Sequence, residues 1–239
     1  MVAAARSLFQ LALVLVLVSW FAAMLYLGVQ GYFRDAGGAF GFSAVQLAII
    51  VPQLAFAAAY LCVRPFARLV RNADLNFLVS IQVVRILALS HLVMWGYGLM
   101  AGSFALPVAL GNFLVFVLAL SAVPAVAHQR RGWRFRIWLL SCIGLTEFLM
   151  TIVLSLAGAF TAPLPFDPAI ADGGYRTFKL PPLSLFPTFA IPALMMVHIA
   201  TLLALWHQRP PSVLALLQSW AGSSIPGPVS GTRFSVDSN

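Results

Sequence analysis

The sequence predicts an all-α polytopic membrane protein, a bundle of six transmembrane helices with both termini in the cytoplasm. Three observations predict this class. First, 62% of the 239 residues are hydrophobic and only 8% are charged. Second, six apolar stretches are long enough to cross a bilayer, and third, basic residues gather in alternate links. Soluble domains carry about 25% charged residues, about three times the share found here. Together with a mean hydropathy of +0.96, this excludes a soluble domain and a disordered chain.

Each predicted span is a run of about 20 mostly apolar residues, the length that crosses about 30 Å of hydrocarbon as a helix. Backbone polar groups in lipid must be satisfied within the segment, so helices are expected rather than strands. The apolar run of the first span is longer than the roughly 7–15 residues of a signal peptide, which favours an anchored helix. The expected spans, which form a transmembrane domain over residues 1–207, are Leu8–Leu27, Ser43–Val63, Phe77–Met100, Pro107–Ala127, Ile137–Phe160 and Leu183–Trp206.

Positive charge differs between the links, and the cytoplasmic links of membrane proteins carry the excess of Lys and Arg. The links after the second and fourth spans are basic, whereas the other three are uncharged or balanced by Asp. This pattern predicts that both termini lie in the cytoplasm. The formal charge of +8 is therefore interpreted as a topology signal with contact to the lipid bilayer, and not as nucleic-acid binding. The basic links contain Arg64, Arg68, Arg71, Arg130, Arg131, Arg134 and Arg136.

Two segments are expected outside the membrane. Residues 162–182 contain five prolines and are predicted to form an irregular loop on the outer side. Residues 208–239 are predicted to be a cytoplasmic tail, in which Val213–Trp220 lies along the membrane surface and the last dozen residues are disordered.

Ionisable side chains inside the spans are the best candidates for a functional site, because each costs about 2.5–3.5 kcal/mol at a helix centre. At 1.5 Å per residue, Arg85, Glu147 and His198 come out roughly 12–15 Å from the inner face on three different helices. We therefore expect an Arg85–Glu147 ion pair with His198 beside it. Gln82, one turn before Arg85, shares its face of the helix.

A second polar level is expected nearer the outer face. His91 and Asn112 both come out about 21–22 Å from the inner face. On an ideal helix His91 is rotated about 120° from Arg85, so it need not face the same interior. Three interpretations of the polar residues stay open: a structural ion pair, an Arg85 that snorkels to the interface, and a site for protons, ions or substrate. No metal site and no catalytic residue is predicted.

Several of these residues lie in stretches that resemble a group of uncharacterised bacterial integral membrane proteins with six predicted spans. The resemblance covers roughly Phe77 to Trp206 and implies no activity. It implies that Arg85, Asn112, Glu147 and His198 belong together. The matching stretches are Gln82-Val-Val-Arg85-Ile-Leu, Phe104-Ala-Leu-Pro107 with Gly111-Asn112, Gly144-Leu-Thr-Glu147, and Phe186-Pro187 through Pro192 to His198.

This chain departs from the pattern that the resemblance implies at three positions. We expect Gly where Ala88 stands, and Asp where Asn112 and Glu147 stand. Glu147 keeps the carboxylate and Asn112 does not. Asn112 therefore lacks the carboxylate that a proton or cation role of the expected Asp would need.

Three functions are compatible with the sequence. The favoured one is a non-enzymatic membrane protein that serves as an accessory, scaffold or assembly subunit, because no nucleotide motif, nucleophile or metal-ligand cluster is present. The first alternative is a small proton-linked transporter that uses the Arg85, Glu147 and His198 cluster. The second is a membrane redox protein that binds haem or a quinone near His198. No cofactor is expected under the favoured interpretation, and other membrane subunits are its expected partners.

Overall fold

The structure is a computed structural model that describes residues 2–33, 43–156 and 181–208, with only the backbone described for residues 2–10 and for residue 156. Contacts divide the chain into two units, Met1–His207 and Gln208–Asn239. The predicted outer loop falls almost entirely outside the described residues, and so do the surface helix and the disordered end predicted for the tail.

The described part of the chain is helical and contains no strand. Six of its helical segments are long and apolar enough to cross a membrane, as the sequence predicted. The third begins two residues before the expected start, at Leu75, and the fourth begins at Gly102 rather than at Pro107. The link between them forms a turn in which Gly98 adopts a φ of +66°, which favours glycine. The six are Leu11–Val29, Ala44–Cys62, Leu75–Gly96, Gly102–Ala127, Trp133–Ser155 and Phe186–His207.

The third span is not one continuous α-helix. It consists of α4 (Leu75–Ile81), the 3₁₀ segment η2 (Gln82–Leu89) and α5 (Ser90–Gly96). The carboxylate of Asp74 caps its start by accepting hydrogen bonds from the backbone N–H groups of Asn76 and Phe77. In a 3₁₀ helix residues three apart eclipse one another, and every third residue from Gln82 to Met94 is indeed buried.

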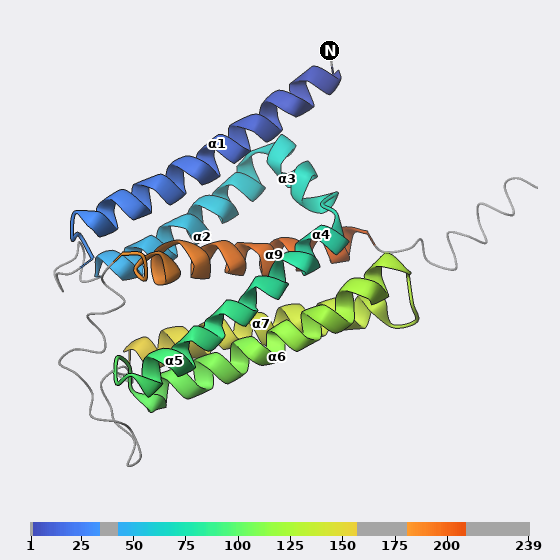
Figure 1. Ribbon diagram of the computed structural model, residues 1–239. Coiled ribbons are helices and arrows are strands. Elements are labelled where there is room, and N and C mark those ends of the chain that lie inside the picture. The colour runs from blue at the N-terminus through green and yellow to red at the C-terminus, as the bar shows by residue number, and fades with distance from the viewer. Residues whose placement is uncertain (1, 34–42, 157–180, 209–239) are drawn as a thin grey trace, which may run out of the picture. The chain divides into compact units, whose positions relative to one another are not determined.

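The helices α6 (Gly102–Ala127) and α7 (Trp133–Leu156) pack along each other, and α7 also packs against the final helix, α9 (Ile191–His207) (Figure 1). Small residues on the buried face of α6 let the backbones of neighbouring helices approach closely. The helix α6 also packs against η2, α4 and α5, and its buried residues contribute to two separate apolar clusters, one with α4 and one with α5. The buried alanines of α6 are Ala105, Ala109, Ala119, Ala122 and Ala125.

The sixth span begins with one irregular turn. The π-helical segment η3 (Phe186–Ala190) contains Pro187 and leads directly into α9, whose second residue is Pro192. Proline lacks the backbone N–H that an α-helix needs, and the wider turn is one way for a helix to accommodate it. The side-chain amide of Gln53 donates a hydrogen bond of 2.8 Å to the carbonyl of Pro192.

The first two spans are peripheral in this unit. The helix α1 (Val2–Val29) contacts η3 through the rings of Trp20 and Phe21, which pack on Phe189. The helix α2 (Ala44–Cys62) starts with a capping box and has no fully buried residue. Figure 1 shows both helices on one side of η3 and α9.

A short helix that the sequence analysis treated only as a basic link lies between the second and third spans. It is α3 (Arg64–Arg71), an amphipathic segment whose Ala67 and Val70 are buried. Its apolar side joins a cluster with Leu78 and Ala200, while its three arginines are exposed. The apolar pattern was missed because the run is only eight residues long, too short for a periodicity to stand out.

Candidate functional site

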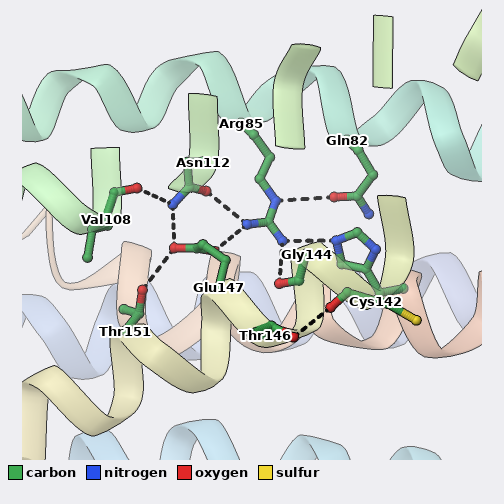
Figure 2. A network of polar contacts seen from close by, with 10 residues as sticks. Gln82, Arg85, Val108, Asn112, Cys142, Gly144, Thr146, Glu147 and Thr151 are labelled. Atoms are coloured by element: carbon green, nitrogen blue, oxygen red, sulfur yellow. Dashed lines mark hydrogen bonds and ion pairs between the residues drawn. The ribbon is translucent and has the colours of Figure 1, made fainter. Parts of the chain in front are cut away.

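A buried ion pair lies at the centre of the bundle. Arg85, from η2, is 2% exposed, and its Nη1 lies 2.5 Å from Oε2 of Glu147 on α7 (Figure 2). The same Nη1 donates a 2.9 Å hydrogen bond to the side-chain oxygen of Asn112 on α6. The structure therefore brings together the expected pair, and it does so with both charges inside the protein.

The second carboxylate oxygen of Glu147 is also bound. Its Oε1 accepts hydrogen bonds from Nδ2 of Asn112 at 2.6 Å and from Oγ1 of Thr151 at 2.9 Å. The amide of Asn112 donates in addition to the carbonyl of Val108, one turn earlier on α6. Burying a carboxylate is costly unless it is paired and hydrogen-bonded, and here both oxygens have partners.

The remaining nitrogens of Arg85 reach three further groups. Its Nε donates to Oε1 of Gln82 at 3.3 Å, and its Nη2 lies 2.9 Å from Nε2 of His198 on α9. The same Nη2 donates a longer bond, 3.4 Å, to the carbonyl of Gly144. The four candidate residues of the first level, Arg85, Glu147, His198 and Gln82, thus meet in one network that joins η2, α6, α7 and α9.

Asn112 lies in this network, as the resemblance implied, and not at a second level with His91, as the depth count predicted. Two features bring Arg85 to the height of Asn112. The third span begins earlier than expected, and η2 rises about 2.0 Å per residue rather than the 1.5 Å of an α-helix. Counting ideal α-helical residues from Phe77 therefore underestimated the depth of Arg85.

His91 shares the buried face of Arg85, in contrast to the expected rotation of about 120°. The 3₁₀ spacing of η2 places Gln82, Arg85 and Ala88 in one row, and His91, in the first turn of α5, continues this row. The ring of His91 lies two 3₁₀ turns from Arg85, where its Nδ1 is 2.7 Å from the carbonyl of Ala88. Its ring also packs edge-on against Phe186, with centroids 4.9 Å apart.

Packing around the network depends on residues that the sequence analysis did not single out as a group. The guanidinium carbon of Arg85 lies 3.8 Å from the ring centroid of Phe148, a cation–π arrangement. A Cβ added at Gly144 would overlap the imidazole of His198, and one added at Gly111 would lie 2.7 Å from Cγ of Glu147. Both glycines therefore let long polar side chains pass close to a neighbouring helix backbone.

The spacing of these residues along the sequence could have indicated that they share one face of α7. Gly144, Glu147, Phe148 and Thr151 recur at intervals of three and four, which is one face of an α-helix. Thr151 in particular follows Glu147 by one turn, where a hydroxyl can reach the carboxylate. Among the described residues, no group of three His, Cys, Asp or Glu side chains could hold a metal ion.

The fold and the site define a multi-pass helical membrane protein with an internally bonded charge pair. The chain belongs to a family described as "Domain of unknown function (DUF8737)", whose model matches residues 42–206. This membership confirms the expectation of a family without an established function. Neither a curated protein nor a solved structure matches the chain.

Proposed function

We propose that this chain is a non-enzymatic membrane protein that serves as an accessory, scaffold or assembly subunit of a membrane complex. In this proposal the Arg85–Glu147 network is a structural clamp that fixes four helical elements. The observation that supports it is the closed bonding of the network. A carboxylate that takes up and releases protons or cations must exchange partners, whereas both oxygens of Glu147 are held by side chains of the same chain.

The partner surface in this proposal is formed by the first two spans. The helix α2 has no fully buried residue, and Leu54 and Leu61 on it are 64% and 80% exposed. Either lipid or an apolar partner helix can cover such a surface, because packing against it requires no charged contacts. The small side chains of α2, which include Ala57, Ala58 and Ala59, allow a close approach of another backbone.

A photo-crosslinking amino acid at Leu54, and separately at Leu61, tests this proposal in membranes of the native host. The expected result is a covalent adduct with one membrane protein of defined mass, recovered in stoichiometric amount after purification in mild detergent. The same crosslinker at Leu140, which is buried in the core of the described unit, is the matched control and should give no adduct. Adducts with lipid alone from both α2 positions would contradict the scaffold function.

A second candidate, the small proton-linked transporter, is favoured by one specific observation. The 3₁₀ segment that carries Arg85 and the π-helical turn before α9 are both irregular, and such segments are common at functional sites. Reconstituted vesicles with a pH-sensitive dye inside distinguish the two functions. A transporter takes up protons under an imposed potential and loses this flux with Glu147→Gln, whereas a scaffold gives the leak of empty vesicles in both forms.

The redox alternative stays a prediction with its own test. In the present arrangement Nε2 of His198 faces Nη2 of Arg85, so that nitrogen would have to change partners before it could ligate iron. An absorption spectrum and elemental analysis of the purified protein decide the matter. A Soret band or a stoichiometric metal would favour the redox function over the scaffold.

The proposed orientation puts both termini in the cytoplasm of a bacterial inner membrane. Seven exposed or half-buried arginines support it, because they lie in α3, in the link between α6 and α7, and in the first turn of α7. Single cysteines at Gln129 and at Tyr97, in a background without the two native cysteines, test the sides. An impermeant maleimide should label position 97 in intact cells and position 129 only after permeabilisation. The reverse result would invert the topology.

A further inference from the structure

Gln82 and His198 share an arrangement that the ion pair does not explain. Each uses one side-chain atom to accept a hydrogen bond from Arg85, and each carries a second polar atom on the same amide or ring. These second atoms, Nε2 of Gln82 and Nδ1 of His198, are buried and have no hydrogen-bond partner among the residues that the structure describes. Both side chains are about 1% exposed.

The identity of the two outer atoms follows from Arg85. A guanidinium has five N–H donors and no acceptor, so the atom that faces it must accept. His198 therefore presents a bare Nε2 to Arg85 and carries its ring proton on Nδ1. By the same reasoning Gln82 turns its oxygen to Arg85 and its NH₂ group away. Both outer atoms are thus N–H donors.

Gln82 and His198 bind neighbouring nitrogens of the same guanidinium. Nε and Nη2 lie on one edge of the planar group, and their N–H bonds form a fixed fork. Gln82 accepts from Nε at 3.3 Å and His198 from Nη2 at 2.9 Å. The amide of Gln82 and the imidazole of His198 are therefore held by adjacent nitrogens of one rigid group. Figure 2 shows the Gln82 amide beside the Nε edge of Arg85.

We propose that Gln82 Nε2 and His198 Nδ1 form a binding site for the oxygen atom of an uncharged molecule, held by two N–H donors inside the membrane domain. Buried donors are hydrogen-bonded in the great majority of folded proteins, and leaving two of them unsatisfied is costly. An acceptor oxygen between them satisfies both. A scaffold and a transporter could both contain this site.

The chemical class of the occupant follows from the charges around it. A cation is excluded, because both groups that face the site are donors. An anion is disfavoured, because Glu147 already neutralises Arg85 and a second negative charge would be buried without a counter-charge. Two sources can supply a neutral acceptor oxygen: an internal water molecule, and the carbonyl of an apolar organic molecule such as a quinone.

Nitrogen-15 NMR of the full chain in lipid nanodiscs tests the site directly. The chain has four histidines, so His198 is assigned by comparison with His198→Gln. The expected spectrum has a protonated Nδ1 and a bare Nε2 on His198. Magnetisation transfer from water to the Nδ1 proton identifies water as the occupant. A shift of this proton on addition of ubiquinone-1, with no transfer from water, identifies an organic carbonyl.

Two variants sharpen the measurement. Gln82→Met removes one donor of the site, and we expect it to abolish the transfer from water or to weaken ubiquinone-1 binding by about tenfold, the equivalent of one hydrogen bond. Thr146→Val is the matched control and should change neither, because this hydroxyl donates to the carbonyl of Cys142 and lies outside the site. A His198 protonated on Nε2 overturns the proposal. So does an Nδ1 proton that neither receives magnetisation from water nor responds to ubiquinone-1.

Discussion

The third to sixth spans and the first two spans are all apolar enough for a membrane, yet the two groups are packed in opposite ways. The third to sixth spans surround an ion pair, and more than a third of the residues in the most apolar window of the third, fifth and sixth are buried. In α1 and α2 the corresponding share is 6% and 0%. Hydrophobicity therefore brings all six spans into the membrane, but specific polar contacts and close packing distinguish the four that form the core.

The largest effect is expected when one member of the ion pair is removed. Arg85→Leu leaves the Glu147 carboxylate buried without its counter-charge, and we expect a loss of about 3–5 kcal/mol in the free energy of unfolding. The double change Arg85→Leu with Glu147→Leu removes both charges and should recover most of this loss. Unfolding in mixed detergent micelles measures both. A double variant no more stable than the single one would show that the pair does not hold the bundle.

The next effect concerns the closeness of α7 and α9. Gly144→Ala places a methyl group within the imidazole of His198, and we expect a loss of about 1–3 kcal/mol in the free energy of unfolding as the helices separate. The matched control is Gly96→Ala, because a Cβ at that position meets no atom within 4 Å. Equal stability of the two variants would mean that the contact between Gly144 and His198 is loose.

A smaller effect is expected from one hydrogen bond at the edge of the network. Thr151→Val keeps the shape of the side chain but removes the donor to Glu147, which should cost about 0.5–1.5 kcal/mol of unfolding free energy. The control on the same helix is Thr146→Val. The exposed hydroxyl of Thr146 donates to the carbonyl of Cys142, one helical turn earlier (Figure 2). If both variants lose the same stability, the bond from Thr151 to the carboxylate has no special weight.

The smallest effect on stability is expected outside the bundle. Leu54→Ala on α2 should change the unfolding free energy of the isolated chain by less than about 0.5 kcal/mol, as for most exposed positions. If α2 is a partner surface, the same change reduces the amount of partner that co-purifies. A large loss of stability in the isolated chain would show that α2 belongs to the core of the fold.

The sequence alone was enough to predict the helical class, the six spans and the proximity of Arg85, Glu147 and His198, because long apolar runs and the depth of charged residues are local quantities. Counting depth along ideal helices did not predict the place of Asn112 or His91, although the resemblance had grouped Asn112 with Arg85. Both depend on the 3₁₀ winding of η2, which changes rise and rotation together. The contacts of Gly144 and Phe148 were also missed, since they arise between helices far apart in the chain.

The 3₁₀ winding of η2 also affects how the chain fits its bilayer. Eight residues at about 2.0 Å each and fourteen at about 1.5 Å give the third span a length of about 37 Å, against about 33 Å for 22 residues of uninterrupted α-helix. A hydrocarbon core of about 30 Å is exceeded by both lengths, and helices accommodate such an excess by tilting. Rewinding η2 into an α-helix would shorten the span by about 4 Å with no change in sequence. The same rewinding would turn His91 out of line with Arg85, so membrane thickness and the alignment of the polar row are mechanically coupled in this helix.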